Sequence, residues 1–267
     1  MLVKVSIRQN RLATIGSAAV IGVLGGLIDL GGAEFRLPLL IRTFGFAALD
    51  AVILNKAISL VVVASALPFR AGSVPLDVLM SHWDVILNLL AGSLLGAWIG
   101  AGWAIRLKTE NFYKIIAILL LLIAGILVFS HHPVNPGLPL FNGALQLIAG
   151  ITAGFAIGVV AALLGVAGGE LLISTLILLF GVDIKLAGSL SLAVSLPTML
   201  TSFGRYSMDQ SFAVLGQNRR FLLQMAAGSL LGAFLGGRLL GVIPEGVLLP
   251  LLALILLISA IKVWRHP

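Results

Sequence analysis

LGVAGGELLI, from Leu164 to Ile173, places two adjacent glycines and a glutamate inside an otherwise apolar stretch. A close echo, DLGGAEFRLP, runs from Asp29 to Pro38. Glycine adopts backbone conformations that other residues avoid, and an ionisable side chain is costly in a nonpolar medium. The two stretches therefore predict that helices break at positions where a polar group or ligand must be bound.

The surrounding composition is that of an integral membrane protein. Of 267 residues, 60% are hydrophobic and only 10% are charged, and the mean hydropathy is +1.14. About 20 apolar residues are needed for a helix to cross the roughly 30 Å of hydrocarbon. We expect an all-α membrane protein, because open sheet edges are not tolerated in lipid. The expected helices lie at residues 12–30, 35–44, 51–67, 85–105, 113–129, 145–166, 171–180, 186–203, 221–240 and 247–264.

The positive charge of the chain fits this class. The net charge is +7 and the pI is about 10.4, which in a soluble protein would suggest nucleic acid. In a membrane protein, Lys and Arg gather on cytoplasmic loops, so we expect membrane lipid and no nucleic acid as partner. The chain has no cysteine, which excludes disulfides and thiolate metal sites, and no metal site or cofactor is expected.

The chain is duplicated. Shifting it by 136 residues brings AGSLLGA at 91–97 onto the identical letters at 227–233. The same shift aligns the two breaks, Gly32 with Gly168 and Glu34 with Glu170. We expect a first membrane repeat at residues 1–130, a linker at 131–143 and a second repeat at 144–267.

The basic residues indicate how the breaks are built. If each break reverses the chain, three crossings follow in each half, and the basic residues outside the membrane divide twelve to three between the two sides. If the two segments around each break instead form a single crossing, each half has four crossings, and the basic residues divide nine to six. The first division favours inverted repeats with both termini cytoplasmic, each repeat a re-entrant or broken helical hairpin followed by three transmembrane helices. The twelve are Lys4, Arg8, Arg11, Arg42, Arg106, Lys108, Lys114, Arg205, Arg219, Arg220, Lys262 and Arg265.

The two breaks predict an anion site. After Gly31-Gly32 and Gly168-Gly169 a helix starts, and its first N–H groups lack intrahelical partners and carry the positive end of the dipole. Two hairpins entering from opposite faces would bring these ends together near the midplane, as in transporters with broken helices. The alternative is that the glycines only allow a tight turn.

An acid follows each break, and bases occur in the first half only. Glu34 and Glu170 either cap the free N–H groups or mark a proton path, and they are our proton-coupling candidates. Arg36 and Lys56 correspond to leucines in the second half. Substrate binding by these bases and ion pairing of Lys56 with one of the glutamates are both open.

A polar stripe runs along one helix in each half. Ser191 and Ser195 lie four residues apart in SLSLAVSLPT, from Ser189 to Thr198, and Asn55 and Ser59 correspond to them. Residues at this spacing share a helix face, so the stripe predicts a cavity lining in both halves. Interhelical hydrogen bonding, or back-bonding to the helix's own carbonyls, is the alternative.

Two further patterns bear on the class of protein. Gly92, Gly96 and Gly100 recur as Gly228, Gly232 and Gly236, a small-residue ridge typical of close helix packing. We find no convincing Ser-His-Asp set, metalloprotease motif or phosphate loop, and we expect no enzymatic activity.

Together these features resemble a known family. The duplicated glycine break, the following Pro38, the SLSLAVSLPT helix and the repeated AGSLLGA are similar to the TauE/SafE sulfite exporter family. The resemblance implies a carrier in the bacterial plasma membrane that moves small sulfur-containing or organic anions, such as sulfite, sulfonates or sulfoacetate, with export as the expected direction. An ion channel or cation carrier using the two glutamates is the alternative, and the sequence leaves a homodimer open.

Overall fold

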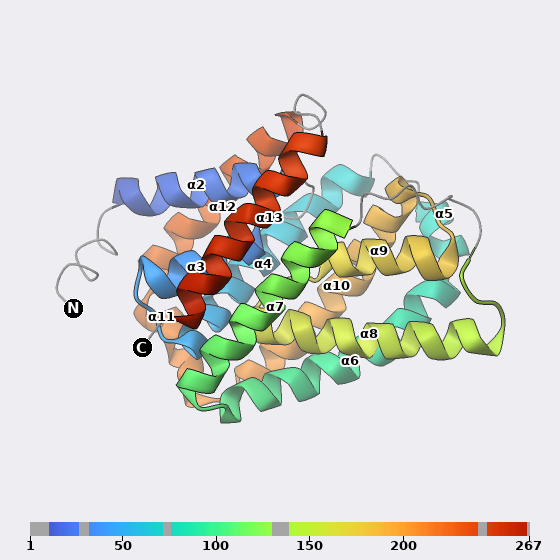
Figure 1. The fold of residues 1–267 in the computed structure, drawn as a ribbon, viewed down its shortest axis with the longest axis horizontal. Helices are drawn as coiled ribbons and strands as arrows, with labels where there is room; N and C mark the ends of the chain where they lie inside the picture. The colour runs from blue at the N-terminus through green and yellow to red at the C-terminus, as the bar shows by residue number, and fades with distance from the viewer. Residues whose placement is uncertain (1–10, 27–31, 72–75, 130–138, 240–244, 266–267) are drawn as a thin grey trace.

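The computed structural model describes residues 11–26, 32–71, 76–129, 139–239 and 245–265 (Figure 1). Within these ranges the chain is helical and contains no strand. Most of the expected linker, and Gly31, lie outside the described residues. The helices are α2 (Arg11–Gly26), α3 (Ala33–Arg42), α4 (Ala48–Ala71), α5 (Leu76–Ser81), α6 (Trp83–Arg106), α7 (Thr109–Phe129), α8 (Ala144–Leu164), α9 (Gly169–Phe180), α10 (Ile184–Tyr206), the short 3₁₀ helix η1 (Gln210–Phe212), α11 (Ala213–Gln217), α12 (Arg219–Leu239) and α13 (Glu245–Trp264).

The helices have the lengths that a bilayer requires. In the described part of the chain, 5 helices are long and apolar enough to cross a membrane. They are α4, α6, α7, α8 and α10. By contrast, α3 has 10 residues and α9 has 12, about 15 and 18 Å at 1.5 Å per residue. The chain is therefore an all-α membrane protein in which two short helices follow the glycine breaks.

The helix boundaries repeat with the sequence. Four helices of the second half start 136 residues after their counterparts, as the starting residues show: Ala33 and Gly169, Ala48 and Ile184, Trp83 and Arg219, Thr109 and Glu245. Two glycines with positive φ after the breaks and two at the ends of the short helices keep the same spacing, namely Gly32 with Gly168 and Gly45 with Gly181.

The two halves interlock rather than sit side by side. Helices of opposite halves pack together, α2 on α12, α8 on α6 and α7 on α13 (Figure 1). Glycines allow this approach: a Cβ on Gly100 would lie 2.9 Å from Val159 Cα, and one on Gly22 would lie 2.5 Å from the Ser229 carbonyl oxygen. The predicted packing role of the glycine ridges is confirmed at these contacts.

The α8–α9 pair is an antiparallel hairpin. Near its base, Gln146 Nε2 donates to the Leu179 carbonyl over 2.7 Å. Near its tip, a Cβ on Gly168 would lie 3.1 Å from Ile157 Cγ2. The chain thus runs on to Leu164, reverses, and starts α9 beside the middle of α8. In the first half Gly32 lies against Ile21 of α2 in the equivalent way.

Contacts between helices fix their relative directions. Ser93 bonds Thr198 at 2.8 Å, and Trp98, further along α6, lies under the guanidinium of Arg205 at 5.6 Å. α10 therefore runs in the same direction as α6, and the glycine contacts place α8 in that direction too. Phe46, which precedes α4, contacts Phe221 at the start of α12; η1 and α11, which lead from α10 into α12, also pack on α4.

Candidate functional site

The site is centred on the starts of the two short helices. The first hydrogen bond of α3 runs from Arg36 N–H to the Gly32 carbonyl at 3.1 Å, and that of α9 from Leu172 N–H to the Gly168 carbonyl at 3.0 Å. The N–H groups of the three residues before each donor precede the helical ladder. Neither N-cap glycine supplies a side-chain cap. Both helix starts therefore present backbone donors and the positive end of a dipole.

The two acids bring these starts into one site. Glu34 is 4% exposed, Glu170 is partly buried, and the two carboxyl groups interact electrostatically. In each, Oε2 is buried without a hydrogen-bond partner. Two carboxylates in a low-dielectric site repel each other when both are ionised. The pair is thus suited to hold a proton, or to give way to a ligand at the helix starts.

Arg36 is committed to its neighbours. Its fully buried guanidinium donates to Asn55 Oδ1 at 2.8 Å, to Ser59 Oγ at 2.6 Å and to Ser229 Oγ at 3.1 Å. These bonds join α3, α4 and α12. Arg36 also interacts electrostatically with Glu34, so it contributes positive charge to the site even though its donors point elsewhere.

Lys56 contacts carbonyl groups at the broken end of α8. Its ammonium donates to the Ala161 carbonyl at 2.8 Å and to the Val166 carbonyl at 2.9 Å. It forms no ion pair with Glu34 or Glu170 among the described residues. The last carbonyls of a helix lack intrahelical donors and carry the negative end of the dipole, so they attract a buried ammonium as a carboxylate would.

Neighbouring polar groups complete this connection between the halves. Asn55 Nδ2 donates to the carbonyls of Ala33 and Leu164, both at 3.0 Å, and Ser59 Oγ lies 3.4 Å from the Gly165 carbonyl. Asn55 and Ser59, the polar stripe of α4, therefore form interhelical hydrogen bonds, and they also lie beside the breaks.

In the second half, Ser191 and Ser195 of the polar stripe make fewer hydrogen bonds to other helices. Leu172, which corresponds to Arg36, is apolar, and Ser191 Oγ donates to the Gly188 carbonyl of its own helix at 2.8 Å. Ser195 is 1% exposed, and its hydroxyl has no partner. Ser195 Oγ, Glu34 Oε2 and Glu170 Oε2 are thus buried polar atoms without partners, the condition expected of groups that await a ligand or a proton.

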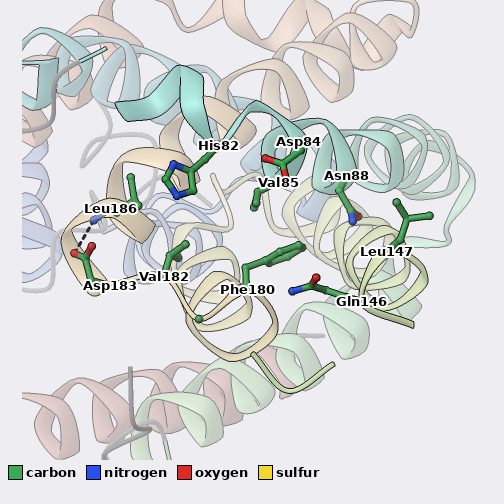
Figure 2. A pocket seen from close by; sticks show the side chains of 11 residues that line it. His82, Asp84, Val85, Asn88, Gln146, Leu147, Phe180, Val182, Asp183 and Leu186 are labelled. Carbon is green, nitrogen blue, oxygen red and sulfur yellow. Dashed lines mark hydrogen bonds between the residues drawn. The ribbon is translucent and has the colours of Figure 1, made fainter. Parts of the chain in front are cut away.

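A cavity of about 700 Å³ opens at the end of the protein where α6, α8 and α10 start (Figure 2). Its polar lining includes His82, Asp84, Asn88, Gln146 and Asp183, and its apolar lining includes Phe180. Asp183 accepts bonds from the N–H groups of Lys185 and Leu186 and so caps α10. The described residues include no group of three or more His, Cys, Asp or Glu side chains that could hold a metal.

A known family matches this chain. The family model described as Sulfite exporter TauE/SafE matches residues 3–128 and residues 80–263. The chain belongs to the TauE/SafE family. No match was found among curated proteins or among solved structures. As a TauE/SafE protein, the chain is a multi-pass membrane protein of a transporter family.

Some residues of this TauE/SafE site escaped sequence reasoning. Ser229 holds Arg36, and Tyr206 donates from its fully buried hydroxyl to the Ala162 carbonyl at 2.9 Å. The signal for Ser229 was present, because it is the serine of the repeated AGSLLGA, which we interpreted only as a packing ridge. Tyr206 gave no such signal, since an aromatic residue at a helix end is typical of the membrane interface.

Proposed function

We propose that the protein is a secondary transporter that moves small sulfur-containing or organic anions, of the sulfite, sulfonate and sulfoacetate class, out of a bacterial cell. The substrate binds between the starts of α3 and α9. The observation that carries the proposal is the electrostatic interaction of two acids, each at the start of a helix that is preceded by a glycine with positive φ. Unpaired N–H groups at helix starts favour anions.

Inverted repeats are part of the proposal. α10 leads through η1 and α11 into α12, and these connecting helices pack on α4, whose preceding Phe46 contacts Phe221 at the start of α12. α10 thus ends at the face where α4 begins. Since α4 and α10 are counterparts, their opposite directions support inversion, and the basic residues then favour cytoplasmic termini in the plasma membrane.

Within the site, each group has a proposed role. The N–H groups that follow Gly32 and Gly168 receive the anion, and the free hydroxyl of Ser195 donates to it. Glu34 and Glu170 are the proton-coupling candidates. The first-half residues Arg36, Asn55, Lys56 and Ser59 act chiefly by position, because their donors already hold α12 and the α8–α9 turn.

Charges at the two ends support export. Asp84, in the lining of the cavity, corresponds to Arg220 at the start of α12, and Asp183 corresponds to Ala47. A basic end attracts anions and an acidic end favours their departure, through rates that depend on ionic strength. An anion leaving alone is also driven outward by an inside-negative potential, by about 2.3 kcal/mol per charge per 100 mV.

Reconstitution into liposomes tests the proposed function. Uptake or efflux of sulfite, alkyl sulfonates, sulfoacetate and chloride is measured under imposed voltage and pH gradients. We expect transport of one of the sulfur anions and loss of that transport in Gly168→Val, because Gly168 has φ 75° and its Cβ would contact Ile157. Gly204→Val is the matched control, since a Cβ there meets nothing within 4 Å. Normal transport by Gly168→Val at normal protein levels would contradict the site.

A further inference from the structure

The two equivalent ends of the protein differ in packing. At one end, Val85 at the start of α6 and Phe180 and Val182 around the end of α9 line the cavity (Figure 2). In the 136-residue repeat, the residues that correspond to these three are, in the same order, Phe221, Phe44 and Phe46. The duplication therefore places two additional phenylalanine rings at the second end, where the first has two valines.

These rings close the second end. The Phe221 centroid lies 4.8 Å from that of Phe44, edge to face, and 5.3 Å from that of Phe46. All three side chains are buried. The packing of the short helices also differs, since α3 packs against α13 in addition to α2 and α4, whereas α9 packs against the counterparts of the last two, α8 and α10. One end is thus hollow and its counterpart is filled by aromatic side chains.

We propose that Phe46 and Phe221 form the gate at the end of the transport path where α4 and α12 begin. The inference rests on the proposed transport function, because a carrier must not be open at both ends at once. A repeat that rocks around a fixed site opens one end as it closes the other. The structure has its cavity at the α6–α10 end, and separation of the Phe46 and Phe221 rings opens the opposite end.

The duplication supplies the variant that tests the gate. Phe46→Val/Phe221→Val gives the second end the residues of the first, and Val85→Phe/Val182→Phe does the reverse. The chain has no cysteine, so single cysteines report access without background. Asn88→Cys reports the cavity, because Asn88 lines it, and Gln224→Cys reports the equivalent position at the second end. Labelling rates with a membrane-impermeant thiol reagent are measured in liposomes and in inverted vesicles.

We expect the double valine variant to raise labelling of Gln224→Cys by about tenfold or more, because a minor conformer of about 0.1–10% becomes a major one. The same variant should lower labelling of Asn88→Cys. The double phenylalanine variant should lower labelling of Asn88→Cys and leave Gln224→Cys slow. This second variant keeps the test valid if the first does not fold.

Unchanged labelling of Gln224→Cys in a folded double valine variant would overturn the gate, as would unchanged labelling of Asn88→Cys in the double phenylalanine variant. Labelling does not depend on any substrate. Failure of the gate is therefore distinguishable from failure of the proposed function, which would appear as absence of anion transport by the unmodified protein.

Discussion

Lys56 of α4 donates a 2.9 Å hydrogen bond to the carbonyl of Val166 in the α8–α9 turn, so a charged side chain of one half holds the break of the other. Lys56→Met removes this bond and the 2.8 Å bond to Ala161. The Ala161 carbonyl keeps the N–H of Val166 at 3.1 Å, whereas the Val166 carbonyl loses its Lys56 donor, at a cost of about 1–3 kcal/mol. We expect a lower thermal unfolding midpoint in detergent.

Leu192, the counterpart of Lys56, gives the control for this variant. Leu192→Met changes shape at an apolar position and should cost less than about 1.5 kcal/mol. Equal unfolding midpoints of the two variants would show that the ammonium does not stabilise the turn.

Ser59 and Ser195 occupy equivalent positions but should respond differently to alanine. Ser59 accepts a 2.6 Å bond from Arg36, so Ser59→Ala should lower stability. Ser195 Oγ has no partner, so Ser195→Ala should leave the unfolding midpoint nearly unchanged. If the hydroxyl donates to the anion, its loss costs about 0.5–1.5 kcal/mol of binding, and KM rises accordingly. A transport assay with both variants checks this, and an unchanged KM in Ser195→Ala would remove Ser195 from the substrate site.

Only part of the fold and of the site could be predicted from the sequence. The breaks at Gly32 and Gly168 and the 136-residue duplication are local or periodic patterns, and both reappear in the helix boundaries. The partners of Lys56 could not be predicted, because they are backbone carbonyls, which no letter of the sequence distinguishes. The packing of α2 on α12 and of α8 on α6 could not be predicted either, since the glycine ridges predict close contacts but do not identify the partner helix.

Gly158 tests the close packing of α6 and α8. A Cβ there would lie 2.9 Å from Ala97 N and from Ser93 Cα, whereas one on Gly125 meets nothing within 4 Å. Overpacking of this kind costs about 1–3 kcal/mol. We expect Gly158→Ala to unfold at lower temperature than the unmodified protein and Gly125→Ala to match it. Unaltered stability of Gly158→Ala would mean that the helices separate readily.

Arg220 should act on the rate of anion capture rather than on stability. Arg220→Gln removes one positive charge from the end opposite Asp84, and we expect a several-fold higher KM for export from inverted vesicles at low salt. The difference should shrink at 1 M salt, where the Debye length is about 3 Å. Arg265→Gln makes the same charge change at the end of the chain and should alter KM less. An effect of Arg220→Gln that is independent of salt would point to a direct contact instead.

Glu170 tests the meaning of the repeated acid. Its Oε2 is buried without a partner, and its carboxyl group interacts with that of Glu34. The basic group that interacts with this pair is Arg36 on α3, through Glu34, and its guanidinium already bonds other side chains. An anion bound at the N–H groups of α9 adds a negative charge beside this carboxyl group, which then binds a proton rather than remain charged in a nonpolar site. Anion binding is thereby linked to proton uptake, so the apparent affinity should fall as pH rises, by at most about tenfold per pH unit for one proton.

Glu170→Gln resembles the protonated acid, and it should keep the low-pH affinity at every pH and lose proton movement with the anion. We expect Glu34→Gln, the matched variant of the first half, to retain part of the dependence, because Glu170 remains ionisable in it. Flux of the anion and of protons, measured together in liposomes between acidic and alkaline pH, checks both variants. Persistence of the full pH dependence in Glu170→Gln at normal protein levels would assign Glu170 to the structure of the α9 start, and the repeated acid would then serve the helix and not the proton.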